Sequence, residues 1–331
     1  GHLPAFVGVL YGIKPAVVAI VLFAAYRIGA RALKKKVLWA ITVNSFLAIT
    51  LLTMPFPFIV LTAAMIGFFV NRYKPAWFVS SGHAASQKSY GKAVIDDDTL
   101  TPAHAVFNWH RLFEFLLIGL LIWLVGMALL VAVFGWDAVY TQMAWFFTKA
   151  VLLTFGGAYA VLPYVYQGAV SHFQWLTPAQ MMDGLALGET TPGPLIMVVA
   201  FVGFVGGWSH DVLQNPLLSA MLAAVVVTFF TFLPSFIFIF VGAPLIESTQ
   251  NNLKLTAPLT AITAAVVGVI VSLAVFFAQH IIWPTGLSGN IDAVSAVAIV
   301  VAGFILFKYK PNIMLLIAIF AALGLVRAWL I

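Results

Sequence analysis

The sequence predicts an all-α polytopic membrane protein with about ten transmembrane helices. Its residues are 63% hydrophobic and only 8% charged, and the mean hydropathy is +1.08. Soluble domains average roughly 45–50% apolar and about 25% charged residues. Several apolar runs approach the ~20 residues that a spanning helix needs, and the alternating pattern of an outer-membrane barrel is absent. The chain is therefore expected to cross the bilayer as helices.

The charges between the apolar segments predict their orientation. Lys and Arg concentrate in residues 27–36 and 72–111, which are expected in the cytoplasm by the positive-inside rule. The turns 135–142, 208–216 and 280–290 contain no Lys or Arg and are expected outside. Alternation places the C-terminus in the periplasm, although 166–190, expected inside, also lacks basic residues. The predicted spans are 4–27, 37–53, 55–71, 112–134, 143–165, 191–207, 217–243, 258–279, 292–307 and 312–330.

An internal repeat is the next signal. Residues 12–33 resemble 255–275, and residues 54–72 resemble 309–327, in the same order. The segments are interpreted as follows: 1–71 is the C-terminal part of a first repeat with three helices, 72–111 a cytoplasmic polar loop, 112–142 a linker helix with a periplasmic turn, and 143–331 a complete second repeat of six helices. An odd linker helix inverts the second repeat, and inverted repeats with broken or re-entrant helices are typical of secondary transporters.

The same repeat predicts a missing part. A counterpart of 143–245 is expected upstream of Gly1, so we expect that this chain alone does not transport.

Two segments of the second repeat interrupt the helical pattern. The first, FTKAVLLTFGGAYAVLPYV (147–165), has a Gly-Gly pair within an apolar run, and the second, DGLALGETTPGP (183–194), precedes the next span. Polar and backbone-permissive residues cluster in both segments. The predicted substrate-binding residues are Lys149, Gly156, Gly157, Tyr159, Tyr164, Thr190, Thr191, Pro192, Gly193 and Pro194.

The second segment has the chemistry of a helix start. Thr190 or Thr191 would be an N-cap, Pro192 suits the first helical position, and Gly193 permits close backbone approach. Free N–H groups and the positive dipole end at such a start favour an oxyanion. The alternative is structural: Gly-Gly allows close helix packing, and Thr-Pro-Gly-Pro begins an interfacial helix.

Ionisable residues near these segments are functional candidates because charges are costly in a membrane. Lys149 could provide a cation for the substrate or could extend to the outer interface. Asp183 and Glu189 could carry protons or act in gating, could balance Lys149, could cap a first helical turn, or could pair with a basic residue of the missing part.

The composition excludes several classes of site. There is no cysteine, and the seven histidines show no metal-ligand spacing, so no metal or other cofactor is expected. The net charge of +6 suits loops near anionic lipid rather than nucleic-acid binding. Whether the protein forms a homodimer is left open by the sequence.

Both interrupted segments resemble hallmark motifs of the chromate ion transporter family. FGGAYAVLPYV (155–165) and LALGETTPGPLIMVVAFVGF (185–204) are similar to motifs of that family's second half, and GIKPAVVAIV (12–21) with RIGARALK (27–34) is similar to the close of its first half. The resemblance implies a long-chain member that lacks the N-terminal part of its first half. It also implies chromate efflux across the bacterial inner membrane, chromate resistance, competition by sulfate, and functional roles for Gly156, Gly157, Tyr159, Glu189, Thr190, Thr191, Pro192, Gly193 and Pro194.

Three alternatives remain at this point. The protein could be an anion channel, a transporter of another oxyanion such as sulfate, or a membrane-embedded enzyme acting on lipid phosphate. An enzyme is disfavoured because no paired-carboxylate or His-metal motif is present. A dianion leaving through about 100 mV gains about 4.6 kcal/mol, so proton coupling is permitted but not required.

Overall fold

The computed structural model describes residues 4–73, 108–153, 158–191, 195–248, 256–284, 286 and 289–330. Helices account for nearly all of these described residues, and no strand occurs among them. In chain order they are α1 (Pro4–Ala32), α2 (Lys36–Leu51), α3 (Phe56–Tyr73), α4 (Trp109–Phe134), α5 (Val139–Leu152), α6 (Ala158–Tyr166), the π-helix η2 (Gln167–His172), α7 (Pro178–Thr190), the short 3₁₀ turn η3 (Leu195–Met197), α8 (Val198–His210), α9 (Pro216–Ser248), α10 (Thr256–Ile282), α11 (Ala293–Tyr309) and α12 (Ile313–Leu330).

The helices are apolar enough for a multi-pass membrane protein. Six are long and apolar enough to cross a bilayer: α1, α3, α4, α9, α10 and α12. Shorter apolar helices occur at 36–51, 195–210 and 293–309. The all-helical class is thus confirmed for the described residues, whereas the number of ten spans stays a prediction.

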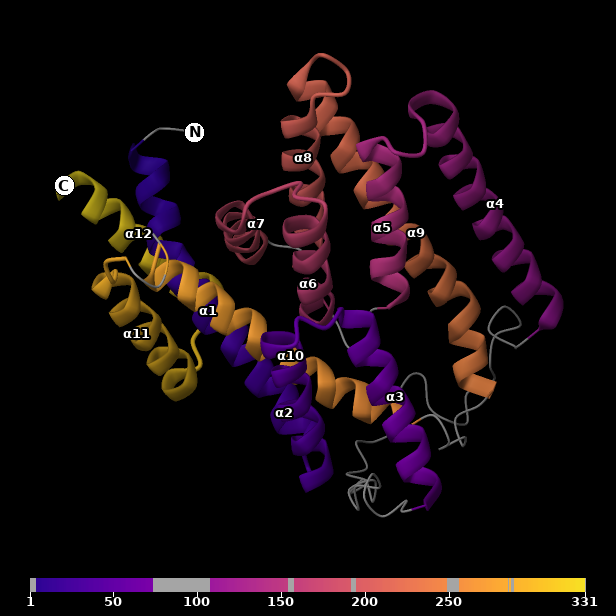
Figure 1. The fold of residues 1–331 in the computed structure, drawn as a ribbon, viewed down its shortest axis with the longest axis horizontal. Helices are drawn as coiled ribbons and strands as arrows, with labels where there is room; N and C mark the ends of the chain where they lie inside the picture. Colours follow the sequence, from indigo (N-terminus) through magenta and orange to yellow (C-terminus); the bar gives the residue numbers. More distant parts are fainter. Residues whose placement is uncertain are drawn as a thin grey trace, which may run out of the picture.

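Helices α1 and α10 form the centre of the molecule. They are the most buried of the six long helices and they pack against each other. Helix α1 also contacts α11 and α12, and α10 also contacts α2 and α3. Figure 1 shows the two flanking pairs at different places along this central pair. The pair α2 and α3, which follows α1 in the sequence, therefore packs on α10, and the pair α11 and α12, which follows α10, packs on α1.

Paired contacts show how the flanking helices run. The Thr42 hydroxyl donates to the Ala264 carbonyl at 2.8 Å, and the Thr50 and Ser272 hydroxyls lie 2.9 Å apart. From the first contact to the second, the position advances by eight residues along each helix, so α2 and α10 run parallel. Near the start of α1, Tyr11 bonds to Asp292, and farther along the ring of Phe23 meets that of Phe307 on α11. Helices α1 and α11 are therefore parallel as well.

Close packing of α1 against α12 depends on glycine. Gly8 and Gly12 lie one turn apart on α1 and face Gly324 on α12, and a Cβ atom at Gly12 would overlap the Phe320 carbonyl oxygen. Small residues four apart let membrane helices approach closely, where dispersion contacts provide the attraction. The GVLYG segment (8–12) therefore fixes this crossing.

The predicted span 143–165 is wrong as a single crossing. The 14 residues of α5 reach only ~21 Å at 1.5 Å per residue, less than the ~30 Å hydrocarbon core. The ring of Phe146 stacks on that of Tyr164 with centroids 4.9 Å apart, and it also meets Phe173 and Trp175. In one continuous helix Phe146 and Tyr164 would be ~27 Å apart. The chain instead turns back after α5, and α6 with η2 returns along it.

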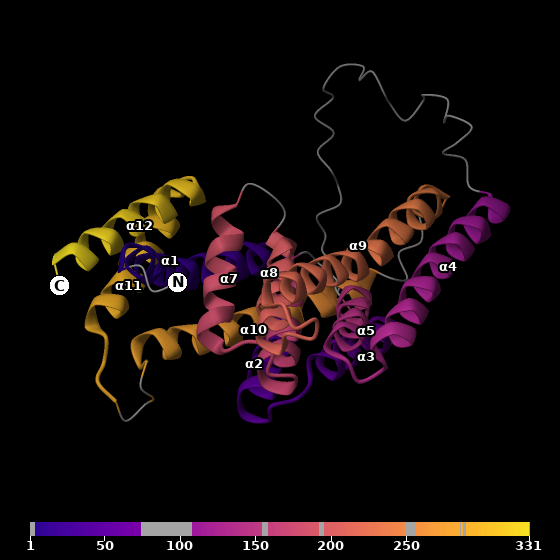
Figure 2. The same ribbon diagram turned by 90° about the horizontal axis from the view of Figure 1, so that it is seen from above.

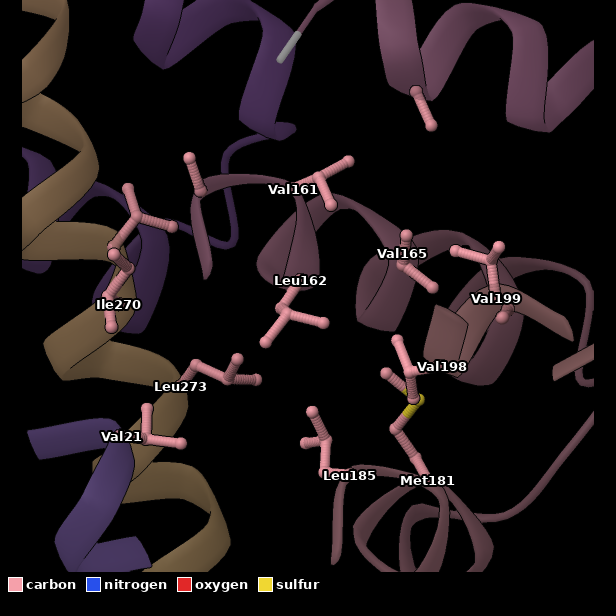
Figure 3. Close-up of a cluster of buried hydrophobic side chains, with 14 of the residues drawn as sticks. Val21, Val161, Leu162, Val165, Met181, Leu185, Val198, Val199, Ile270 and Leu273 are labelled. Atoms are coloured by element: carbon pink, nitrogen blue, oxygen red, sulfur yellow. The ribbon is translucent and has the colours of Figure 1, made fainter. Parts of the chain in front are cut away.

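This hairpin and α7 pack against the central helices. Figure 2 shows α7 crossing the direction of α8 rather than running beside it. Val21 of α1, Leu162 of α6, Leu185 of α7 and Leu273 of α10 point toward one another in one apolar cluster (Figure 3). The interrupted segments of the second repeat are thus held against α1, which precedes them by more than a hundred residues.

Helix α4 lies at the edge of the molecule, beside α9 (Figure 1). It is apolar on all sides, yet most of its large side chains are exposed. An exposed apolar helix of 26 residues is long enough to span a bilayer with some tilt, so lipid is expected to cover this face.

Gly12→Val should destabilise the protein by about 3 kcal/mol or more, because the new side chain overlaps backbone atoms of α12. Thermal unfolding in detergent would measure the loss. Gly303→Val on α11 is the matched control, since a Cβ atom there meets nothing within 4 Å. Equal unfolding midpoints for the two variants would contradict the close α1–α12 contact.

Candidate functional site

A hydrogen bond joins the two interrupted segments. The Tyr159 hydroxyl on α6 donates to Glu189 Oε1 near the end of α7, at 2.6 Å, in a part-buried setting. Tyr159 lies two residues after the Gly-Gly pair, and Glu189 directly precedes the Thr-Thr-Pro-Gly-Pro run. Arg27 of α1 lies within electrostatic range of this tyrosine. Two motifs about thirty residues apart in the sequence are thereby brought to one place.

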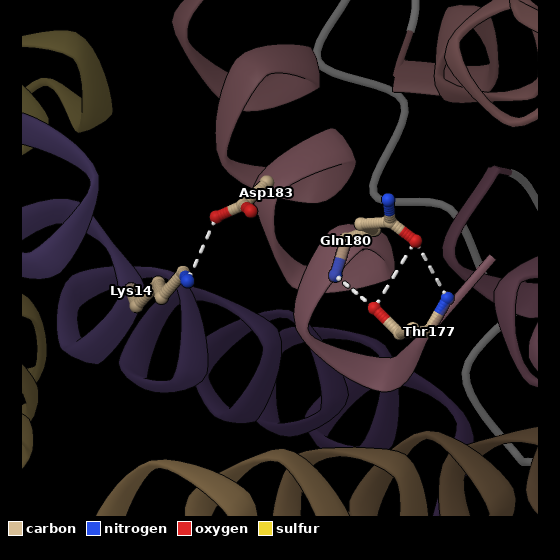
Figure 4. Close-up of polar contacts among 4 residues, drawn as sticks. All are labelled: Lys14, Thr177, Gln180 and Asp183. Carbon is tan, nitrogen blue, oxygen red and sulfur yellow. Dashed lines mark hydrogen bonds and ion pairs between the residues drawn. The ribbon is translucent and has the colours of Figure 1, made fainter. Parts of the chain in front are cut away.

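Helix α7 begins with a capping box. The Thr177 hydroxyl accepts from the Gln180 N–H at 3.2 Å, and the Thr177 N–H donates to Gln180 Oε1 at 2.8 Å (Figure 4). Pro178 occupies the first turn, where its missing N–H costs nothing. The Thr-Pro pair that starts a helix is therefore at 177–178.

The expected N-cap at Thr190 or Thr191 is wrong. Thr190 is the last residue of α7 and Thr191 is its C-cap, and both hydroxyls donate to the Leu187 carbonyl, at 2.9 and 2.7 Å. Ser and Thr hydroxyls readily bond to carbonyls one turn back, and Pro commonly follows a helix end. The next helical turn starts at Leu195, so a substrate-binding role for both threonines stays a prediction.

Asp183 forms an ion pair with a residue outside the second repeat. Its carboxylate lies 2.9 Å from the Lys14 ammonium on α1, and each side chain is less than a quarter exposed (Figure 4). The structure therefore pairs Asp183 with Lys14, and not with Lys149 or with a basic residue of the missing part, the two partners that the sequence suggested. The pair attaches α7 to α1 at the helix centre, where an unpaired charge would be costly.

A pocket of about 720 Å³ lies on another side of α6. Lys149 and Tyr164 line it, as do residues of the α2–α3 turn, η2 and the second half of α10, whereas neither Tyr159 nor Glu189 does. Lys149 is half-buried, and its ammonium lies 5.3 Å from the centre of the Trp145 ring. The predicted site residues thus divide into two groups, one on each side of α6.

Gln167 attaches the α2–α3 turn to this hairpin. Its Oε1 accepts from the Phe56 N–H at 2.9 Å, and its Nε2 donates to the Met54 carbonyl at 3.2 Å. Gln167 is the first residue of the π-helix η2, which follows Pro163 by four residues. Such wide turns are frequent at functional sites, since they re-aim side chains.

Five predicted residues lie outside the described part of the chain: Gly156, Gly157, Pro192, Gly193 and Pro194. Sequence reasoning did not single out Lys14 or Gln167 as site residues. Lys14 had a readable signal, because a charge next to Pro15 within an apolar run is costly unless it is paired. Gln167 had none. Among the described residues no group of three potential metal ligands comes together.

Comparison with known proteins identifies related sequences. The family model for the chromate transporter matches residues 141–325, more than half of the chain. A chromate transport protein of Pseudomonas aeruginosa is 39% identical over 131 residues, which are 40% of this chain and 28% of that protein. A chromate transport protein of Cupriavidus metallidurans is 28% identical over 170 residues, covering 51% of this chain and 37% of that protein.

A more distant relative broadens the comparison. An uncharacterized transporter of Methanocaldococcus jannaschii is 27% identical over 176 residues, covering 53% of this chain and 39% of that protein. The chain thus spans well under half the length of the curated relatives named here. No solved structure matches it significantly. Since the matched region contains both interrupted segments and their hydrogen bond, the chain belongs to the chromate transporter family.

Proposed function

We propose that the protein is part of a secondary transporter that exports chromate, or a similar tetrahedral dianion such as sulfate, across the bacterial inner membrane. Family membership supports the substrate class, and several relatives are named chromate transport proteins. Export would be downhill, since about 100 mV, inside negative, favours exit of a dianion by about 4.6 kcal/mol, or over three decades of gradient. Chromate resistance follows from such export.

The observation that carries this proposal is the hydrogen bond from Tyr159 to Glu189. It joins the segment after the Gly-Gly pair to the segment before Pro-Gly-Pro, which supports the proposal that the two motifs contribute to one site. Irregular backbone within a membrane is tolerated where it lines a cavity or is buried in protein. N–H and hydroxyl donors there suit a tetrahedral oxyanion and release it more easily than a dense arginine cluster would.

Two inverted repeats are part of the same proposal. The packing of α1 with α11 and α12 resembles that of α10 with α2 and α3, and both α1–α11 and α10–α2 run parallel. Each central helix thus packs against the flanking pair of the other repeat. Such an exchange is expected when 1–71 and 143–331 hold equivalent helices in opposite orientations. The α5–α6 hairpin also suggests why residues 166–190, which the sequence analysis expected inside, contain no Lys or Arg. If the chain turns back, that segment starts on the side where α5 begins, outside the cytoplasm.

The ion pair between Lys14 and Asp183 has a defined place in this scheme. It links α1 of the first repeat to α7 of the second. Glu189, hydrogen-bonded to Tyr159, is the acid nearer to the proposed site and is the candidate for proton coupling or gating. Asp183 acts by holding α7 in place.

Tyr159→Phe should reduce chromate uptake into inside-out vesicles by about tenfold, because a hydrogen bond to a charged group contributes about 1.5–3 kcal/mol. The full-length protein would be used, with and without excess sulfate. Tyr140→Phe is the matched control, since Tyr140 is buried on α5 and its hydroxyl donates a long hydrogen bond of 3.4 Å to the Ser219 carbonyl. Saturable uptake that sulfate inhibits would support the substrate class. Unchanged uptake in Tyr159→Phe would refute the role of the pair, and nonsaturating flux would favour a channel.

Lys14→Met should lower thermal stability by about 2–3 kcal/mol, because it leaves the Asp183 carboxylate unpaired and mostly buried. The double exchange Lys14→Asp with Asp183→Lys should restore most of the loss, since it reverses the pair and keeps both charges. Unfolding midpoints in detergent would measure both variants. An exchange variant no more stable than Lys14→Met would show that the two residues do not interact as described.

A further inference from the structure

The pocket beside Lys149 carries a second inference. Its walls come from the α2–α3 turn, α5, the α6–η2 segment and the second half of α10, so both parts of the chain contribute. It contains polar side chains able to donate hydrogen bonds: Thr53, Lys149, Tyr164, Ser171, His172 and Gln279. At about 720 Å³ it has ample room for a hydrated tetrahedral anion. The pocket is therefore large, polar in part, and shared by distant segments.

The charges of the pocket have one sign. Among the described residues that line it, none is Asp or Glu, whereas Lys149 contributes a cation. Lys14 pairs with Asp183, away from this pocket. Among the described residues, by contrast, no carboxylate oxygen lies within 4 Å of the Lys149 ammonium. This ammonium lies over the Trp145 ring instead. A half-buried cation without a carboxylate partner favours an anion from solution, since desolvated charges require compensation.

Several of the segments that line the pocket do so near their C-terminal ends. Thr53 follows the end of α2, Gln279 lies near the end of α10, and Ser171 and His172 close the η2 segment. Ser171 and His172 are exposed. In the predicted orientation, these ends face outward, away from the basic residues 27–36. The pocket would then lie on the periplasmic side of α6, and the pair of Tyr159 and Glu189 on its other side.

We propose that this pocket is a second anion-binding site, a periplasmic vestibule that takes a free tetrahedral oxyanion of the sulfate or chromate class through Lys149. Its role as the exit of a transport path rests on the proposed function, whereas its binding of the anion does not. Lipid phosphate shares the same chemistry, so the test distinguishes a soluble anion from a headgroup. Proposed binding at two places, one on each side of α6, would let the substrate pass from one site to the next.

Cysteine labelling tests this proposal without measuring transport. This chain has no cysteine, so Ser171→Cys introduces a single thiol at the pocket mouth in these 331 residues. In the full-length protein, with any cysteine outside these residues replaced, the thiol would react with an anionic or a cationic methanethiosulfonate of similar size. The quantity measured is the ratio of the labelling rate with the anionic reagent to the rate with the cationic one. This ratio should be higher when Lys149 is present than after Lys149→Gln. The ratio should fall by about fivefold, because one unit charge about 8 Å away in a water-like medium changes the rate of each reagent by roughly twofold and in opposite directions.

Protection by a ligand forms the second arm. Sodium sulfate in lipid-free detergent should slow labelling, compared with sodium chloride at equal ionic strength, and Lys149→Gln should abolish that protection. Lys149→Arg should retain it, which would separate loss of charge from misfolding. The control is Lys308→Gln, because Lys308 also lies over aromatic rings but on α11, outside the pocket.

Four results would overturn the proposal. Sulfate could fail to protect the thiol, or could protect equally in Lys149→Gln. Vesicles of phosphatidylcholine with phosphatidylglycerol could protect it where sulfate does not, which would assign the pocket to a lipid headgroup. If the charged reagents labelled the thiol in inside-out vesicles but not in intact cells, the periplasmic opening would be refuted. If the full-length protein took up no chromate but sulfate still protected the thiol, the transport proposal would be refuted and the anion-binding site would be supported.

Discussion

The contact between α1 and α10 is the constraint on which the rest of the structure depends. Lipid tails are as apolar as leucine, so membrane helices gain little from hydrophobic burial and associate through close packing. The two central helices are rich in Ala and Val, and their buried faces are continuous with the main core. Every other buried element, from the α2–α3 turn to α12, contacts one or both of them directly or through a neighbour. Loss of this contact would therefore separate the two parts of the chain.

That central pair also explains how broken helices are accommodated. A chain that stops its helix inside a membrane leaves backbone groups to be satisfied. Here α5 ends at Leu152 and α6 begins at Ala158, and the returning segment packs on α5 and α10. The Gln167 amide satisfies backbone groups of the α2–α3 turn in the same region. Interrupted helices thus lie against protein, and the polar groups of the proposed sites are gathered where the interruptions occur.

Charge placement follows the same logic. Of the few ionisable residues within the helices, Lys14 and Asp183 pair with each other, and Glu189 accepts from Tyr159. Lys149 differs, since its described neighbours are aromatic or neutral and it borders a pocket. Paired groups fix helices, while an uncompensated cation is available for a ligand. This contrast separates residues that position the site from the residue proposed to bind the anion.

The sequence by itself determined the helical membrane class, the positions of the apolar segments and the two motifs that mark the family. These are local properties, because a run of apolar residues, a Gly-Gly pair or a Thr-Pro-Gly-Pro run can be read within twenty residues. Hydropathy cannot distinguish one crossing from a hairpin, since lipid and protein interior are similarly apolar, and residues 143–165 were predicted as one span for that reason. Only the tertiary structure decided that Phe146 meets Tyr164, that Asp183 pairs with Lys14, and that the site residues divide across α6. Each of these contacts joins residues far apart in the chain, and they depend on packing that local pattern does not encode.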